Sequence, residues 1–119
     1  MTIEDMYVRI YKALAHPIRI KIVRTLRDGP LCVCTLNENV EFSQSNLSQH
    51  LKILKDSGIL KSEKDALKIL YSIKDDEVKN LLEITEKMIK NEISMMNNRL
   101  SEDSNTTKLS IAPIKSLIL

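Results

Sequence analysis

The sequence predicts a mainly α-helical domain with one small β-hairpin, and three features lead to that prediction. Glycine (2) and proline (3) are scarce among the 119 residues, which favours helices over a turn-rich fold. Apolar residues recur at helical spacing along most of the chain, whereas the stretch ILKSEKDALKILYSI shows the shorter period of strands. One Phe and three Tyr are the only aromatic residues, so the core of this small domain must be aliphatic.

The first two helices are separated by a proline. Residues 3–15 place apolar side chains on one stripe, as an amphipathic helix does. Pro17 interrupts this pattern and suits the first turn of a second helix, because proline there loses no helical hydrogen bond. Gly29 ends the second helix. His16, next to Pro17, is expected to cap a helix or pack rather than to bind a ligand.

A short helix and a longer one follow. Pro30 opens the short helix, over roughly 30–38, and the segment VEFS forms the turn after it. Ser43 then accepts a backbone N–H to cap a helix over 43–57, which Gly58 stops. The inward stripe of that helix consists of Leu47, Leu51 and Leu54.

The rest of the chain completes a known order of elements. Two short strands, 59–63 and 68–73, form the hairpin around a turn that lacks Gly and Asn. An acidic first turn begins a long helix over about 76–100. Residues 1–100 thus form one domain, and 101–119 are expected to be a linker with an apolar C-terminal tail. The order helix, helix, short helix, turn, helix, hairpin, long helix is that of a winged helix-turn-helix, α-α-α-α-β-β-α.

The 43–57 helix is therefore expected to lie in the major groove of DNA. Its outer face carries small amides and hydroxyls, which hydrogen-bond base edges and phosphates, and lysines follow as phosphate contacts. The Lys-rich hairpin would contact the adjacent DNA backbone as the wing. A plain amphipathic helix is the alternative, but it does not explain why amides and hydroxyls stand where Glu and Lys are usual. His50 suits DNA contact and an inward hydrogen bond equally well. The predicted DNA contacts are Gln44, Ser45, Asn46, Ser48, Gln49, His50, Lys52, Lys55, Lys61, Lys64 and Lys68.

Charge is unevenly distributed around a net value of +2. Residues 7–27 sum to +6, residues 43–74 to +3 and residues 75–92 to −3. A basic body with an acidic helix suggests a polyanion partner, although ordinary solvated helix faces show similar runs. The sequence has no Gly-rich phosphate loop and no plausible acid–base pair, so we do not expect an enzyme. No segment approaches the length of a membrane span, and the charged N-terminus does not resemble a signal peptide, so we expect a cytoplasmic location.

The segment PLCVCTL holds the only two cysteines, Cys32 and Cys34. In the cytoplasm such a pair is more typical of a metal or redox site than of a structural disulfide. The start of a helix favours thiolate, the form that binds soft metals and metalloids. Residues i and i+2 of a helix point about 200° apart, so one ion would reach both sulfurs only by opening the turn. That distortion would loosen the neighbouring DNA-reading helix. Two alternatives remain, a dithiol redox or persulfide switch and two inert core residues.

Four stretches together resemble the ArsR/SmtB-type metal-sensing transcriptional repressors: ALAHPIRIKIVRTL, PLCVCTL, SQSNLSQHLKILKDSGIL and LKILYSI. The resemblance covers most of residues 12–74. It implies a homodimer that represses an operon until an inducer releases it from an operator, which for a dimer is an imperfect palindrome. A protein-interaction module with the same fold but no DNA binding is the alternative from another class. The resemblance places the subunit contact on the first and last helices, at Tyr7, Ile10, Leu14, Leu81, Leu82, Met88, Ile89, Ile93 and Met96.

The Cys-Val-Cys motif resembles that of the arsenite-, cadmium- and lead-responsive branch, which places a metal site at Cys32 and Cys34. Two features depart from the branch: position 37 is Asn, and no cysteine precedes the motif. A third ligand would therefore be a small thiol or water. As(III) or Sb(III) is the favoured inducer, followed by Cd(II) and Pb(II), and no permanent cofactor is expected. The last helix has no His, so we expect no zinc or nickel site there.

Overall fold

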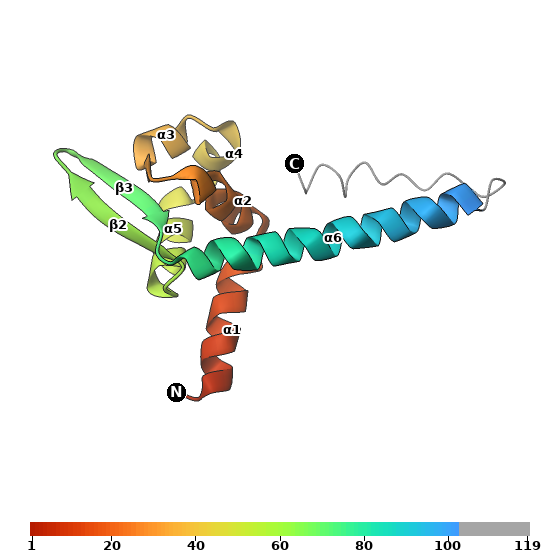
Figure 1. The fold of residues 1–119 in the computed structure, drawn as a ribbon. Helices are drawn as coiled ribbons and strands as arrows, with labels where there is room; N and C mark the ends of the chain where they lie inside the picture. Colours follow the sequence, from red (N-terminus) through yellow and green to blue (C-terminus); the bar gives the residue numbers. More distant parts are fainter. Residues whose placement is uncertain (103–119) are drawn as a thin grey trace. The chain divides into compact units, whose positions relative to one another are not determined.

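The structure is a computed structural model that describes residues 1–102. They form two compact units, residues 1–79 and the residues from Asn80 onward. Mainly helical structure with a small antiparallel sheet confirms the predicted winged helix-turn-helix (Figure 1). The helices are α1 (Ile3–Leu14), α2 (Pro17–Thr25), η1 (Leu26–Asp28), α3 (Val33–Asn37), α4 (Val40–Ser43), α5 (Leu47–Asp56) and α6 (Asp76–Glu102), and the strands are β1 (Leu31–Cys32), β2 (Leu60–Asp65) and β3 (Lys68–Ile73).

Helix α2 begins as its sequence predicts. Pro17 occupies its first turn, and His16 is its N-cap, with Nδ1 accepting a hydrogen bond from the Ile18 N–H at 3.1 Å. This satisfies one of the backbone donors that the start of a helix leaves without a partner. The predicted capping role of His16 is confirmed.

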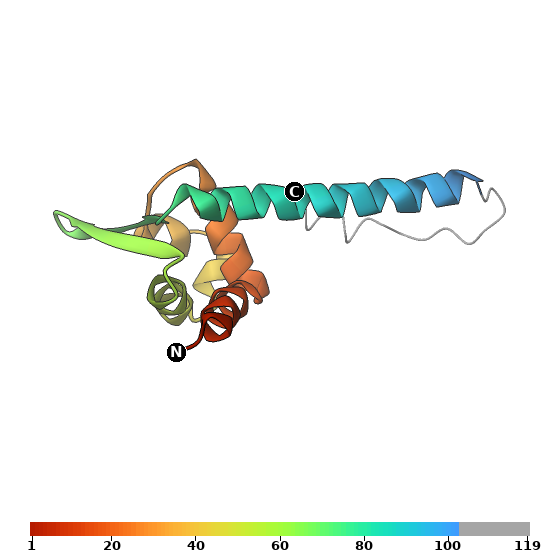
Figure 2. The same cartoon turned by 60° about the horizontal axis from the view of Figure 1, so that its bottom comes forward.

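Two arginines hold α1 against its neighbours through the carbonyl ends of helices. Arg19 donates from Nε to the Ala13 carbonyl at 2.7 Å and from Nη2 to the Lys12 carbonyl at 3.3 Å, at the end of α1. Arg9 donates to the Asp56 carbonyl at the end of α5. Figure 2 shows α1 (dark red) and α5 (olive) nearly end-on, side by side. Cations at these carbonyls complement the negative end of each helix.

The helix-turn-helix pair differs from its prediction at the start of its first helix and in the segment between the two helices. The expected single helix over 30–38 is a two-residue strand followed by α3, and VEFS is the one-turn helix α4 rather than a turn. Asn39 caps α4 by accepting the Glu41 N–H at 2.9 Å, and Phe42 is buried. Burial of Phe42, the only Phe of the chain, thus holds α4 in the core, whereas the polar residues around it had indicated a turn.

Helix α5 begins at Leu47 rather than Ser43, with Asn46 as its N-cap residue. Its C-terminal end follows the prediction: Gly58, at φ +82°, donates to the Lys55 carbonyl, and Ile59 donates to the Leu54 carbonyl, each at 3.0 Å. These two bonds form a Schellman motif, in which glycine takes the left-handed position. The predicted inward leucines, Leu47, Leu51 and Leu54, are all buried.

The sheet has the order β1-β3-β2 and is antiparallel throughout. Its hairpin turns at Ala66 and Leu67, two residues beyond the expected strand end, with Ala66 in the left-handed region at φ +55°. Leu60 and Ile73 are paired at the base of the hairpin and are both buried. Strand β1 was not predicted, because a two-residue strand leaves almost no periodic signal.

Helix α6 continues through Glu102, past the expected end near residue 100. The expected linker and apolar tail fall on 101–119, and all but the first two of these residues lie outside the described part. Among residues 1–102, no helix is long and apolar enough to cross a membrane.

Candidate DNA-reading surface and cysteine site

The polar residues at the start of α5 form a small hydrogen-bonded group on the surface. Asn46 donates from Nδ2 to Gln49 Oε1 at 2.7 Å, and Ser48 Oγ donates to Asn46 Oδ1 at 3.5 Å. All three side chains are exposed. The group therefore presents amide and hydroxyl atoms to solvent at the end of the helix that enters the major groove in this fold.

Gln44 and Ser45 lie before α5 rather than on it. Gln44 is the exposed C-cap residue of α4. Ser45 is half-buried, and its Oγ donates to the Phe42 carbonyl at 2.7 Å. Of these two predicted DNA contacts, Gln44 has its side chain on the surface, whereas the Ser45 hydroxyl closes the turn between α4 and α5.

The two lysines of α5 are exposed, but one has a carboxylate partner. Lys52 Nζ lies 2.7 Å from Asp56 Oδ2, one helical turn away. The hydrogen bond from Lys52 holds the pKa of Asp56 below its usual value. A phosphate at Lys52 must therefore compete with Asp56. No such partner is resolved for Lys55 among residues 1–102.

His50 points inward and joins α5 to α2. Its ring centroid lies 4.5 Å from that of His16, and its Nδ1 lies 3.5 Å from Arg19 Nη1. Arginine has donors only, so Nδ1 of His50 accepts in this contact and its proton is on Nε2. Nδ1 of His16 likewise accepts, from the Ile18 N–H. Burial lowers the pKa of His50, and the electrostatic interactions with His16 and Arg19 lower it further.

The wing lysines do not share one face of the hairpin. Cross-strand partners lie on the same side of a sheet, and successive residues alternate sides. Lys64 pairs with Ile69, on the side that continues from the buried base. The opposite side carries Lys61 and Lys68 together with the carboxylates of Glu63 and Asp65.

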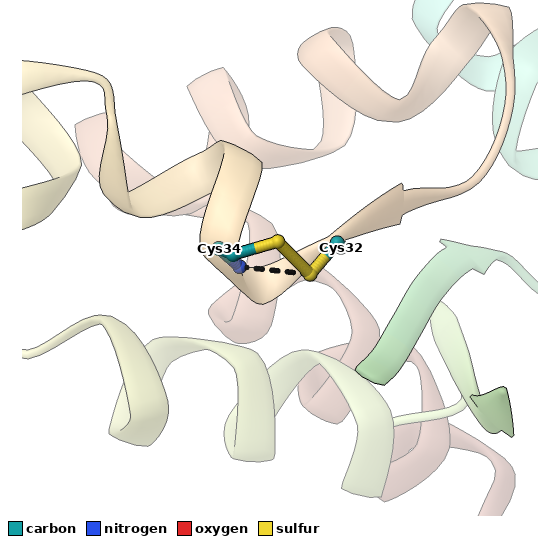
Figure 3. The surroundings of a disulfide bond; sticks show 2 residues. All are labelled: Cys32 and Cys34. Carbon is teal, nitrogen blue, oxygen red and sulfur yellow. Dashed lines mark hydrogen bonds between the residues drawn. A yellow bond between two sulfur atoms is a disulfide. The ribbon is translucent and has the colours of Figure 1, made fainter. Parts of the chain in front are cut away.

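The cysteine site forms at the junction of β1 and α3, not within a helix. Cys32 is the N-cap residue of α3 with extended backbone, φ −68° and ψ 146°, and its Sγ accepts the Cys34 N–H at 3.1 Å. The two sulfurs form a disulfide, with the Cα atoms 5.1 Å apart (Figure 3). The expectation that the sulfurs diverge by about 200° was wrong, because it placed both cysteines on one helix.

The site is accessible from solvent. Cys34 is exposed and Cys32 is half-buried, so the reading of both as inert core residues is not supported. No group of three or more His, Cys, Asp or Glu side chains that could hold a metal ion occurs within residues 1–102. One chain thus offers two sulfur ligands, which suits a species that takes its remaining ligands from solution.

The residues expected at a subunit contact differ in exposure. Tyr7 and Ile10 of α1 are 58% and 40% exposed, and Met88 of α6 is 66% exposed. Leu14 belongs to the buried core. Among the other α6 residues, Leu82 and Ile93 are buried, and Leu81, Ile89 and Met96 are half-buried.

Comparison with known proteins places this arrangement in a family. Residues 16–62 match the family "Bacterial regulatory protein, arsR family". Over 77 residues the chain is 42% identical to the arsenical resistance operon repressor of Bacillus subtilis (strain 168), covering 64% of this chain and 73% of that protein. This chain belongs to the ArsR family. As a member of a family of transcriptional regulators, it is not an enzyme, as the sequence predicts.

Two further relatives fit the ArsR membership. The chain is 40% identical over 76 residues to the cadmium resistance transcriptional regulatory protein CadC homolog of Staphylococcus aureus, and the match spans 63% of each protein. The crystal structure of M. tuberculosis Rv0081 superposes with a TM-score of 0.70 at 30% identity, covering 79% of this chain and 96% of that one.

Sequence reasoning missed two functional contacts, both of which join elements distant in sequence. Arg19 reaches His50 across 31 positions, and Cys32 pairs with Leu70 across the sheet. The run Leu31-Cys32-Val33 carried a weak strand signal, since apolar and β-branched residues favour strands. Nothing in the sequence near His50 indicated that its ring turns inward.

Proposed function

We propose that this ArsR-family regulator is an operator-binding repressor that releases DNA when As(III) or Sb(III) binds Cys32 and Cys34. The observation that carries the proposal is the position of the two sulfurs. They lie within bonding distance of each other, partly exposed, beside the elements that contact DNA in this fold. The arsenical resistance repressor and the cadmium regulator among its relatives support a thiophilic inducer.

The chemistry requires the reduced pair. Arsenous acid, As(OH)₃, condenses with two thiols to form two As–S bonds and release two waters, and one hydroxyl remains on arsenic. A small-molecule thiol can replace that hydroxyl with loss of a third water. Two protein thiols therefore suffice for this ligand. Cd(II) and Pb(II) prefer more thiolates and would bind this pair less tightly.

DNA binding rests on the exposed polar group of α5 and on the wing. Asn46, Ser48 and Gln49 can read base edges, and Gln44, Lys52 and Lys55 can contact phosphates. Lys61, Lys64 and Lys68 would contact the flanking backbone. Ser45 and His50 act instead within the chain, at the α4–α5 turn and at α2.

A second copy of the chain is the expected partner. Helix α1 exposes a broad apolar surface that a solvent-facing helix would not retain: Ile3, Met6, Tyr7, Val8, Ile10 and Tyr11 are each at least 40% exposed. This α1 surface and the exposed Met88 of α6 would each contact the second copy in the homodimer, so the operator would be an imperfect palindrome.

A second candidate function is favoured by the disulfide itself. Hydrogen peroxide would oxidise one thiol to a sulfenic acid and release water. The other thiol would then displace a second water to form the disulfide, so that two electrons pass from sulfur to peroxide. In that case the oxidised chain, rather than the arsenical adduct, would be the form released from DNA.

The test is operator binding with each inducer. The reduced chain selects its operator from a random double-stranded pool, and the affinity is then measured with arsenite, antimonite, cadmium, lead or peroxide. We expect arsenite to weaken binding about a hundredfold, equivalent to about 2.7 kcal/mol of coupling. Response to peroxide alone would favour the redox function. Absence of salt-sensitive DNA binding would favour a protein-interaction module instead.

A further inference from the structure

The backbone of Cys32 belongs to two elements at once. It is the N-cap residue of α3, and it is also the last residue of β1, which pairs with the wing strand β3. The register sets Leu31 opposite Tyr71 and Cys32 opposite Leu70. The sulfur site is therefore attached directly to the main chain of the wing.

The extended Cys32 removes the need to distort α3. Because Cys32 lies outside the helix, both sulfurs reach one point without opening a helical turn. What changes when the inducer binds is the freedom of the two sulfurs, because two separate thiols become bonded to one arsenic or antimony atom. The adjustment that brings both sulfurs onto that atom must be absorbed by α3 or by β1.

Strand β1 is the element that yields more easily. Helix α3 is fixed by Leu36, which is 1% exposed, whereas β1 has two residues, both half-buried. A two-residue strand has few contacts to resist displacement. Its pairing point at Leu70 and Tyr71 lies outward of the buried Leu60–Ile73 base, so a shift of β1 acts on the free part of the hairpin.

The charge pattern of the wing makes its attraction to DNA sensitive to a small rotation of the hairpin. One side presents Lys64 without a carboxylate among its cross-strand neighbours, and the other presents Glu63 and Asp65 among its lysines. Turning the hairpin about its length would bring these carboxylates toward DNA phosphates. Attraction at Lys64 would thus be replaced by a side on which the charges of Lys61 and Lys68 are offset by those of Glu63 and Asp65, without any movement of α5.

We propose that the Cys32–Cys34 site regulates DNA affinity through the wing, by displacing β1 against β3, rather than through the recognition helix α5. This rests on the proposed function of the same site. The wing contacts are the part of the DNA interface that the inducer removes, and the α5 contacts persist in the inducer-bound form.

The first experiment compares inducer responses of matched variants. The variant Lys61→Ala/Lys64→Ala/Lys68→Ala lacks all three wing lysines, and the control Gln49→Ala lacks a contact of α5. Both should bind the operator more weakly than the parent. With arsenite, the wing variant should lose less than about threefold further affinity, because its wing contacts are already gone, while Gln49→Ala should keep the full hundredfold response. A wing variant with the full response would overturn the proposal.

The second experiment needs no DNA and separates the two proposals. Amide hydrogen exchange is measured on the reduced chain with and without arsenite. Faster exchange at residues 62–65 and 69–72, with residues 47–56 unchanged, is the expected result. Changes confined to 47–56 would overturn the wing route. If the parent shows wing changes but no loss of operator affinity, the repressor function fails while the structural coupling stands.

Discussion

The cysteine pair and the histidine pair lie in the same small domain, but they join different DNA-contacting parts. Cys32 and Cys34 connect α3 to the wing through β1. His16 and His50, with Arg19, connect α2 to the recognition helix. The first junction is partly exposed, whereas the second consists of two half-buried rings. Under the proposed function, inducer sensing and base reading would therefore have separate supports, and an inducer could weaken DNA binding without unfolding α5.

The largest expected effect belongs to the sulfur junction. Cys34→Ser should remove the entire response to arsenite, about a hundredfold in operator affinity, because one thiol cannot form two bonds to arsenic. His50→Gln should retain that response, since the histidine junction does not touch the sulfur site. Operator titrations with and without arsenite measure both. An arsenite response that survives in both Cys34→Ser and Cys32→Ser would remove the basis for sensing at this pair.

Acid should affect the histidine junction and spare the sulfur one. Since the pKa of His50 is lowered in the folded chain, the unfolded chain binds more protons just below pH 6.5. The stability from the neutral ring is therefore complete above about pH 6.5 and is lost as pH falls.

The measurement is urea unfolding at pH 7.5 and 5.5, in the parent and in His50→Gln. Glutamine does not titrate, so the variant should show a smaller loss of stability at pH 5.5 than the parent. An unchanged pH dependence in the variant would mean that other groups dominate acid stability.

Gly58 lies between α5, which carries His50, and β2, the first strand of the wing. It therefore connects the two DNA-contacting parts. At φ +82° a Cβ is strained even though the surrounding space is open. Gly58→Ala should lower the free energy of unfolding by about 1 kcal/mol. Thermal unfolding followed by circular dichroism checks this, and Gly58→Asn, which tolerates the left-handed region better, should lose less.

The smallest expected effect lies at the tip of the wing. Ala66 has φ +55°, which costs an L-residue more than glycine. Ala66→Gly should therefore raise stability by about 0.5 kcal/mol, net of the entropy that glycine loses on folding. The unfolding midpoint should rise slightly while the pH dependence stays as in the parent. A lower midpoint would show that glycine entropy outweighs the relief of backbone strain.

Patterns among neighbouring residues predicted most helices and strands, whereas contacts between distant parts of the chain determine the geometry of the cysteine site. Pro17, Gly58 and the leucines of α5 each carry their structural meaning in their own neighbourhood, and their predicted roles hold. The start of α5 was misplaced because Ser43, a good cap in isolation, ends α4 instead. The divergence expected for the two sulfurs failed because pairing with β3 extends Cys32, and that pairing depends on a partner almost forty residues away.

The two arginines at helix ends bear on how this protein meets DNA. Arg9, Arg19 and Lys21 supply half of the charge in the most basic stretch, but they engage helix carbonyls and Glu41. Each phosphate neutralised by a protein cation releases condensed counterions, with a slope of about 0.9 in log affinity against log salt. Side chains already paired within the chain contribute little to that slope. The salt dependence of DNA binding should therefore reflect mainly the lysines of α5 and the wing. It should indicate fewer phosphate contacts than the net charge of residues 7–27 would suggest.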